Sequence, residues 1–273
     1  MLSHRAARRS TRLTGATHLT MKAEFSLNPS ISAAKGYLVD LDGTLMSGGQ
    51  LLPEADTLLG LLQNRFVIVS NDSEHTPSQL ERKFRQWNLK IPADRILLAG
   101  TCALETIARR QPGARILIIG STALRRHAQK LGLVPDAERP QAVLVARDRR
   151  FTFERLYNAV NAVKAGAELY VACPDRTHPA PDGGLFPEAG ALAAAIFACV
   201  GDVSHHVIGK PETALFHMGC ERLCIAPQDA VMIGDNPLTD AAGAARAGLR
   251  FLQVEPNRPQ SAIRFWRDYR ALA

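Results

Sequence analysis

The chain has 273 residues, of which 46% are hydrophobic and 22% are charged. This composition is typical of a globular chain with a sizeable core, and it excludes low-complexity and collagen-like classes. The net charge of +7 would suit a nucleic-acid partner, but most of it lies within residues 1–23, which contain no acidic residue. The basic residues there are Arg5, Arg8, Arg9, Arg12 and Lys22. The remainder is nearly neutral, so we expect no nucleic-acid partner.

Residues 1–34 form a leader rich in Ser, Thr, Ala and Arg, without an apolar run. A secretory signal requires such a run and is therefore excluded. A transit peptide, a disordered arm and an early translation start at Met1 remain alternatives, because Met21 offers a later start. We favour disorder or a misassigned start. The longest later apolar run, residues 192–200, is too short to cross a bilayer, so we expect no membrane partner.

The five cysteines are odd in number and scattered, and no C-x-x-C pair occurs among them: Cys102, Cys173, Cys199, Cys220 and Cys224. This pattern favours reduced thiols over disulfides or a zinc site, and it predicts a cytoplasmic protein.

From residue 35 onward, short β-branched runs alternate with helical patterns. Residues 35–41 and 65–70 read as strands. Between them, residues 54–64 place four apolar side chains on one helical face. Thr76, followed by Pro77 and a Gln three residues after the Thr, predicts the start of another helix. Later strand candidates are the runs ARILIIG, AVLVAR, ELYVAC, HHVIGK, AVMIGD and RFLQVE.

Repeated alternation of strands and helices predicts parallel sheets covered by helices, which is an α/β fold. Residues 35–112 and 204–273 are predicted to make one doubly wound sheet. Residues 113–203 are predicted to form a second α/β unit inserted between them, with a loop rich in Pro and Gly at 174–190.

The first strand candidate ends in the sequence Asp40-Leu41-Asp42-Gly43-Thr44. Side chains alternate in direction along a strand, so Asp40 and Asp42 would point the same way if the strand continued regularly. Two like charges so close together are unfavourable unless something offsets them. A bound divalent cation would do so.

Three more polar stretches follow strand candidates: Ser70-Asn71-Asp72, Gly209-Lys210-Pro211, and Gly234-Asp235-Asn236 with Asp240 beyond it. In open α/β sheets, ligands bind at the carboxyl ends of the strands. Carboxylates suit Mg²⁺, and a hydroxyl, backbone N–H groups and an ammonium suit a phosphoryl group.

Each of these elements alone has an ordinary structural explanation. An Asp at a strand end is most often a helix cap or a turn residue, and Ser70-Asn71 could be turn chemistry. For Lys210 or Ser70 taken singly, the structural explanation is at least as good as a functional one. All four stretches in this order favour a catalytic site.

These stretches resemble the four motifs of the haloacid dehalogenase superfamily of hydrolases. The segments GGQLLPEADTLL, NDSEHTPSQLERKFRQWNL, ARDRRFTFERL, PDRTHPAPDGGLFPEAGAL and VIGKPETALF resemble its NagD-type, or nitrophenylphosphatase-like, group. The resemblance covers roughly residues 35–255. It implies a Rossmann-like core at 35–112 and 204–273, an inserted α/β cap at 113–203, and hydrolysis of phosphate monoesters that depends on Mg²⁺.

The resemblance also implies roles for individual residues. Asp40 matches the nucleophile that forms an aspartyl-phosphate, and covalent catalysis by a carboxylate divides a hard hydrolysis into two displacements. Asp42 matches the general acid and base. Lys210 matches the cation that screens the charges of the nucleophile and the phosphoryl group. The implied phosphate-binding set is Ser70, Asn71, Lys210, Gly43 and Thr44.

The implied metal ligands are the carboxylates of Asp40 and Asp235 and the backbone carbonyl of Asp42. Asp240 and Asn236 are implied to have supporting roles. Asp240 either binds the metal ion through a water molecule or orients Lys210. In the cap, loop residues at matching places contact the substrate's leaving group. The candidates for substrate specificity are Asp148, Asp175, Arg176 and His178, for each of which a plain polar turn is an equal alternative.

Three positions depart from the common pattern of the resembling group. Asp72 follows Asn71 where a second Asn is frequent, and an acid near phosphate would repel it, so we expect its side chain to point away. The pair Asn236-Pro237 replaces a common Arg-Leu type pair. Glu188 stands in place of the Gly of a Pro-Gly turn. These departures affect the identity of the substrate more than the type of reaction.

The leading interpretation is a phosphatase that requires Mg²⁺ and acts on a small phosphorylated metabolite. Whether the protein forms a homo-oligomer is left open. Two alternatives remain, which are a phosphomutase of the same superfamily and a receiver-like protein that binds Mg²⁺ and phosphate without turnover. Asp42 disfavours the binding module, which needs no general acid, and it also disfavours a dehalogenase.

Overall fold

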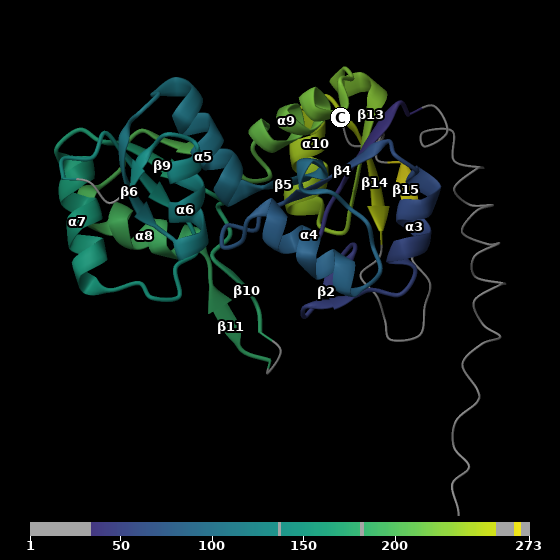
Figure 1. Cartoon of the computed structure of the whole chain (residues 1–273), viewed down its shortest axis with the longest axis horizontal. Coiled ribbons are helices and arrows are strands. Elements are labelled where there is room, and N and C mark those ends of the chain that lie inside the picture. Colours follow the sequence, from purple (N-terminus) through teal and green to yellow (C-terminus); the bar gives the residue numbers. More distant parts are fainter. Residues whose placement is uncertain (1–33, 136–137, 181–182, 255–264, 269–273) are drawn as a thin grey trace, which may run out of the picture.

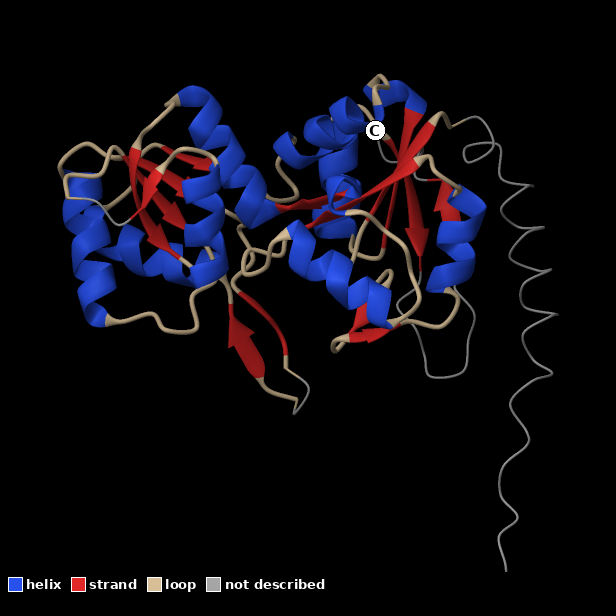
Figure 2. Ribbon diagram, viewed as in Figure 1, coloured by secondary structure: helices blue, strands red, loops and turns tan. Residues whose placement is uncertain are grey.

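The computed structural model describes residues 34–135, 138–180, 183–254 and 265–268. The predictions for the leader fall on residues 1–33, outside this part. The chain forms two α/β units side by side, each built on its own sheet (Figure 1). In both units helices flank the strands of the large sheet, as the colouring by secondary structure shows (Figure 2). The predicted α/β class with two parallel-sheet units is confirmed.

The core sheet has six strands in the order β15-β14-β13-β1-β4-β5, and every neighbouring pair is parallel except β14 and β15. Its strands are β1 (Gly36–Val39), β4 (Phe66–Ser70), β5 (Ile96–Leu98), β13 (Ala230–Gly234), β14 (Arg250–Val254) and β15 (Phe265–Asp268). Its helices are α3 (Ala55–Leu62), α4 (Pro77–Gln86), α5 (Ala99–Arg110), α9 (Ala214–Leu223) and α10 (Ala242–Arg246), with short turns η1 (Ala93–Arg95), η2 (Pro227–Asp229) and η3 (Pro237–Ala241).

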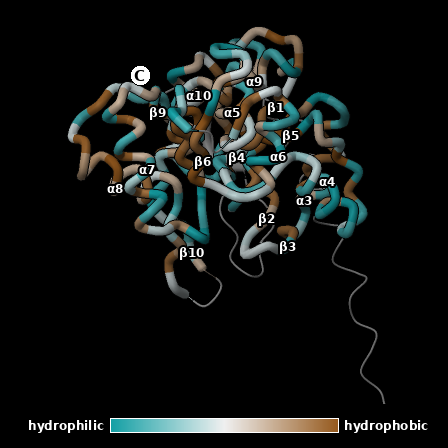
Figure 3. The backbone as a smooth tube through the Cα atoms, turned by 60° about the vertical axis from the view of Figure 1, so that its left-hand side comes forward, coloured by the Kyte–Doolittle hydropathy of each residue, from teal (hydrophilic) through white to brown (hydrophobic). Residues whose placement is uncertain are grey.

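Both faces of the core sheet are buried, which explains why its strands read as continuous apolar runs. In β1, Leu38 packs in one cluster with residues of α5, α9 and α10, while Tyr37 and Val39 pack in another with residues of α3 and α4. Hydrophobic residues, coloured brown, surround β4, β6 and α5 in the interior, whereas α4 at the outside is mostly hydrophilic and coloured teal (Figure 3).

Two predicted helices are confirmed in detail. In α3 the four predicted apolar residues are the buried ones: Ala55, Leu58, Leu59 and Leu62. Thr76 and Gln79 form a reciprocal capping box at the start of α4, with Pro77 in the first turn. These helices could be predicted because periodicity and capping depend only on contiguous residues.

The cap sheet has five parallel strands in the order β12-β9-β8-β6-β7. They are β6 (Arg115–Ile119), β7 (Val134–Pro135), β8 (Ala142–Val145), β9 (Glu168–Val171) and β12 (His205–Val207). The cap helices are α6 (Thr122–Lys130), α7 (Phe153–Lys164) and α8 (Ala189–Val200). Two antiparallel hairpins complete the chain, β10 (Thr177–Pro179) with β11 (Leu185–Pro187) in the cap, and β2 (Met46–Ser47) with β3 (Gln50–Leu51) in the core.

The structure corrects one predicted boundary. The sequence places residues 204–208 in the core, but β12 pairs with β9 of the cap. Backbone hydrogen bonds continue this pairing to Gly209, whose N–H donates to the carbonyl of Ala172 at 2.7 Å. The segment that leads to Lys210 is therefore an edge strand of the cap sheet. A strand of three residues carries no sequence signal that identifies its partner.

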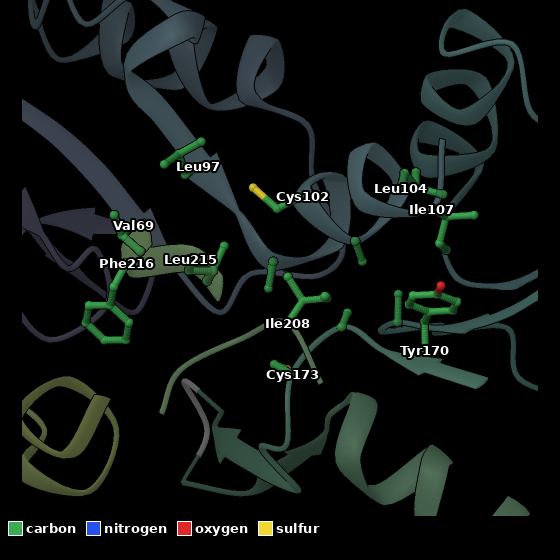
Figure 4. Close-up of a cluster of buried hydrophobic side chains, with 14 of the residues drawn as sticks. Val69, Leu97, Cys102, Leu104, Ile107, Tyr170, Cys173, Ile208, Leu215 and Phe216 are labelled. Atoms are coloured by element: carbon green, nitrogen blue, oxygen red, sulfur yellow. The ribbon is translucent and has the colours of Figure 1, made fainter. Parts of the chain in front are cut away.

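One apolar cluster runs through both units and joins them. It contains Val69 and Phe216 of the core, Ile107 of α5, and Tyr170 of the cap. In Figure 4 these side chains form a continuous path, with Cys102 and Ile208 between the two ends. Continuous burial of this kind fixes the cap on the core, because separating the two would expose the shared apolar surface to water.

All five cysteines are free thiols, three of them buried. None of the helices in the described ranges combines the length and the apolar character that crossing a membrane requires.

Candidate active site

The predicted motif residues converge at the carboxyl edge of the core sheet. Asp40 follows β1, Ser70 ends β4 and Asp235 follows β13. The Nζ atom of Lys210 contacts Oδ1 of Asp40 and lies 2.7 Å from Oδ1 of Asp240. Asp40, Lys210 and Asp240 are almost completely buried, at 5%, 3% and 0% exposure. The structure thus forms a buried ion triplet from residues of three separate motifs.

Asp40, Asp235 and Asp240 form the carboxylate group best placed to hold a metal ion in the described part of the chain. One oxygen from each lies within 4.8 Å of the others. Lys210 compensates only one of these three charges, which leaves two in excess. Carboxylate oxygens are the ligands that Mg²⁺ prefers. The donor set and its uncompensated charge therefore fit a divalent cation.

Burial and charge shift the pKa values of this group strongly. Burial, followed by the neighbouring Asp240, raises the pKa of Asp235 to about 6. Burial also raises the pKa of Asp40, against the opposing attraction of Lys210. Burial alone would lower the pKa of Lys210, but the carboxylates of Asp240 and Asp40 outweigh it and raise the pKa. Lys210 is therefore a permanent ammonium beside a crowded set of carboxylates.

Asp42 follows Leu41 in the turn after β1 and remains accessible to solvent. Partial loss of hydration, followed by the negative charge of Asp72, raises its pKa, while Lys210, His178 and Lys83 oppose the shift. A carboxyl group with a raised pKa retains its proton to higher pH. This property suits a residue that must donate a proton to a leaving group.

Gly43 and Thr44 form the tight turn after Asp42. The Gly43 N–H donates to the Met46 carbonyl at 2.7 Å, so the turn itself uses this group. Gly43 has φ +90°, and a Cβ there would lie 2.2 Å from an Asp235 oxygen, so only glycine fits. The buried Thr44 hydroxyl has no hydrogen-bond partner among the described residues, which suits a residue that contacts a bound ligand.

The side chains of Ser70 and Asn71, in the second polar stretch, have different functions. The Ser70 hydroxyl is buried at the end of β4 and accepts from the Asp72 N–H at 3.0 Å, so its own hydrogen can be donated to a ligand. The Asn71 side chain instead faces Lys210. Its Oδ1 accepts from the Lys210 N–H at 2.7 Å, and its Nδ2 donates to the Lys210 carbonyl at 2.9 Å.

Asp72 is held in its own turn. It accepts hydrogen bonds from the N–H groups of Glu74 and His75, and its Oδ2 lies 2.7 Å from Nδ1 of His75. These contacts agree with the expectation that Asp72 points away from a phosphoryl group, although its charge still acts on Asp42.

Asn236 and Asp240 stabilise the turn after β13. Oδ1 of Asn236 accepts from the Leu238 N–H at 2.9 Å, and the Asn236 N–H donates to Oδ2 of Asp240 at 3.2 Å. The other oxygen of Asp240 faces Lys210. This contact suits the predicted alternative in which Asp240 orients Lys210, and its place beside Asp40 and Asp235 suits the alternative of a metal ligand.

The cap places two of its four predicted residues, Asp175 and His178, beside the core motifs. Oδ2 of Asp175 accepts from Nδ2 of Asn71 at 2.9 Å, and Arg176 next to it is exposed. His178 contacts Glu188 through Nδ1. Burial and the charge of Arg147 lower the pKa of His178, and Asp42 opposes this shift, so His178 is close enough to Asp42 for their charges to interact.

Asp148 occupies a different position. Its carboxylate contacts Arg155 of α7 and accepts from the Arg150 N–H at 2.9 Å, so it is engaged inside the cap. The preceding residue, Arg147, faces the core instead, with its N–H donating to the Ser73 hydroxyl at 3.0 Å. The expectation that Asp148 contacts substrate is not supported by this position, because alternate residues of an extended segment point in opposite directions.

Two residues of the cap were missed as site candidates. Arg147 lies 3.3 Å from Glu188 and 3.4 Å from Glu74, and its guanidinium covers the Phe186 ring at 5.3 Å. Burial raises the pKa of Glu188 to about 7. The only sequence signal was the unusual Glu188 after Pro187. No local pattern predicts that Arg147 would reach it.

Comparison with known proteins agrees with this geometry. Residues 37–134 match a haloacid dehalogenase-like hydrolase model, and residues 207–261 match a HAD-hydrolase-like model. A dihydroxyacetone phosphatase of Corynebacterium glutamicum is 29% identical over 221 residues, 80% of each chain. The stretch between the two matches contains most of the cap, as expected for an insertion.

Solved structures give the same result. A magnesium complex of a glycerol phosphate phosphatase from Mycobacterium tuberculosis superposes with TM-score 0.74 and 30% identity, covering 81% of this chain and 67% of that one. A 4-nitrophenylphosphatase from Thermotoga maritima superposes with TM-score 0.79 and 26% identity, covering 85% and 90%. The chain therefore belongs to the haloacid dehalogenase-like hydrolases, in the NagD-type, nitrophenylphosphatase-like group.

Proposed function

We propose that this protein hydrolyses phosphate monoesters of small metabolites with Mg²⁺ as cofactor, through an aspartyl-phosphate at Asp40. The observation that carries the proposal is the excess of negative charge at the buried site. Three converging carboxylates share one ammonium, and a further cation would offset the remaining negative charge. The family and the phosphatase relatives support the same reaction class.

The reaction consists of two displacements. In the first, a carboxylate oxygen of Asp40 attacks phosphorus, the ester P–O bond breaks, and the proton of Asp42 passes to the leaving alkoxide. In the second, Asp42 takes a proton from water, whose oxygen attacks phosphorus and breaks the bond to Asp40. The products are an alcohol and inorganic phosphate, and both aspartates return to their starting states.

The other residues bind and orient. Lys210, fixed between Asp40 and Asp240, screens the charge between the nucleophile and the phosphoryl group. The hydroxyls of Ser70 and Thr44 are placed to donate to phosphoryl oxygens. Asp40 and Asp235, with the Asp42 carbonyl, would hold Mg²⁺, which stabilises the charge of the phosphoryl group in the transition state.

The substrate is proposed to be a small phosphorylated compound whose leaving group lies under the cap, near His178 and Arg147. The C. glutamicum relative is a dihydroxyacetone phosphatase and the M. tuberculosis one a glycerol phosphate phosphatase, so three-carbon esters are the first candidates. The free thiols are consistent with a cytoplasmic location, which we retain as part of the proposal.

The test is a phosphate-release assay over a panel of esters, with Mg²⁺ and with a chelator. The panel contains dihydroxyacetone phosphate, glycerol phosphate, a 5′-nucleotide, a hexose phosphate and p-nitrophenyl phosphate. Release of phosphate that requires Mg²⁺ is the expected result. Isomerisation of the hexose phosphate without release would indicate the phosphomutase instead. Binding of Mg²⁺ and phosphate without turnover of any ester would indicate the receiver-like protein.

A further inference from the structure

We propose that Asp175 is a positioning residue through which the cap holds Lys210 in its catalytic place, with Asn71 as the link. The inference rests on the proposed function and assigns Asp175 a role different from the substrate contact that the sequence suggests. It concerns three residues that come from three separate segments and meet at the boundary of cap and core.

The hydrogen bonds around Asn71 leave little freedom. Its Oδ1 accepts from the Lys210 N–H at 2.7 Å, and its Nδ2 donates both to the Lys210 carbonyl and to Oδ2 of Asp175, each at 2.9 Å. A carboxylate can only accept, so Asp175 requires the Nδ2 side of the amide to face it. That orientation is the one in which Asn71 pairs with both polar groups of the Lys210 peptide.

The three residues are fixed by different elements. Asn71 follows β4 of the core, Asp175 follows β9 of the cap, and Lys210 follows the cap edge strand β12. The approach is close, because a Cβ at Gly209 would lie 2.7 Å from Oδ1 of Asn71. The Asp175 backbone is itself anchored, since its carbonyl accepts from the Gly190 N–H at 2.8 Å at the start of α8.

The position of the Lys210 ammonium depends on this linkage. The ammonium must lie between Asp40 and Asp240, both of which belong to the core, although the Lys210 backbone leaves the cap sheet. The Asn71 amide is the direct hydrogen-bonded link between the core and the Lys210 peptide, and Asp175 holds that amide from the cap side. Loss of Asp175 would let the amide rotate and the lysine backbone shift.

The experiment compares Asp175→Ala and Asp175→Asn with wild type on two substrates, the best metabolite of the panel and p-nitrophenyl phosphate. Asp202→Ala is the matched control, because Asp202 is an exposed aspartate before the start of β12, at the end of that strand opposite to Lys210. We expect Asp175→Ala to lower kcat by about 10- to 100-fold on both substrates, with KM changed by less than about threefold. Asp175→Asn keeps an acceptor for Nδ2 and should stay within about threefold of wild type.

A double-mutant cycle with Asn71→Ala tests the linkage itself. If Asp175 acts through Asn71, adding Asp175→Ala to Asn71→Ala should cost less than about twofold further. Thermal unfolding of each variant checks the fold. Should Asp175→Ala fail to fold, Asp175→Ser replaces it, because the shorter side chain cannot reach Nδ2 of Asn71 from the same backbone.

Three results would overturn the inference. A loss on the metabolite with little loss on p-nitrophenyl phosphate would make Asp175 a substrate contact. If the kcat losses of the two single variants multiply in the double mutant, Asp175 and Asn71 act independently. An altered unfolding temperature with unchanged kcat would make the contact merely structural. In all three cases wild type still releases phosphate, whereas failure of the proposed function would appear as a wild type that hydrolyses no ester.

Discussion

Lys210 and Asp40 are 170 positions apart in the chain, leave strands of two different sheets, and form a direct ion pair with Asp240 as third member. Asp40 follows the central strand of the core, and Lys210 follows the edge strand of the cap. The site is therefore completed only when cap and core are packed as observed. The shared apolar cluster around α5 maintains that packing.

Asp40→Asn should abolish turnover and leave the fold intact. The change preserves the size of the side chain but removes the nucleophile, and loss of a covalent step costs several orders of magnitude in rate. The measurement is phosphate release on the best ester of the panel, with Asp56→Asn on the exposed face of α3 as control. Activity within about tenfold of wild type would exclude Asp40 as nucleophile.

Mg²⁺ should stabilise the protein as well as support activity. Binding of an ion to the folded state alone adds about 2.7 kcal/mol to the unfolding free energy at 100 times its Kd. Thermal unfolding of wild type should thus shift upward with Mg²⁺ and return on chelation.

Asp235→Asn is the matched variant for the metal site. Without metal it should be as stable as wild type or more stable, because it removes one uncompensated carboxylate. With Mg²⁺ its upward shift should be much smaller. An equal shift in both proteins would place the ion elsewhere, and hydrolysis that continues in chelator would contradict the metal requirement.

Arg176→Ala and His178→Ala should change substrate discrimination, since His178 is close enough to Asp42, the proposed general acid, for their charges to interact. We expect kcat/KM to fall about 10- to 100-fold for a polar metabolite, the loss of one or two hydrogen bonds. For p-nitrophenyl phosphate, whose leaving group has few polar groups, the change should be only a few-fold. Equal losses on both substrates would instead indicate support of the common chemical step or of the fold.

The Asp72–His75 pair should make stability depend on pH. The hydrogen bond to Asp72 raises the pKa of His75, so its contribution is complete below the unfolded value of about 6.5 and is lost as pH rises through the folded value. Despite burial, the hydrogen bond from His75 lowers the pKa of Asp72, so its contribution is lost only in acid. The pair should therefore be strongest between about pH 4 and 6.5.

Urea unfolding of wild type and His75→Gln at pH 5.5 and 8.5 measures this effect. The loss of stability in the variant should be larger at pH 5.5. His217→Gln, at an exposed position of α9, controls for removal of a histidine. A difference that is equal at both pH values, or larger at 8.5, would contradict the assigned pair.

The sequence predicted the elements whose signals are local. The capping box at Thr76, the apolar face of α3 and the apolar strand before Asp40 all depend on residues that are neighbours along the chain. The convergence of Asp40, Ser70 and Asp235 could also be anticipated, because β1 pairs with β4 and β13 and the carboxyl ends of neighbouring parallel strands meet at one edge of a sheet.

Only the tertiary structure decided the rest. The edge strand β12 pairs with β9 of the cap sheet and not with a strand of the core. A strand of three residues has too weak a sequence preference to determine its partner, so tertiary packing decides which neighbour it pairs with. The contacts of Asn71 with Asp175 and Lys210 span 104 and 139 positions, and the contact of Arg147 with Glu74 crosses the boundary of the two units. Periodicity and capping describe the chain over a few residues, whereas these contacts are fixed by how two separately formed sheets pack against one helix.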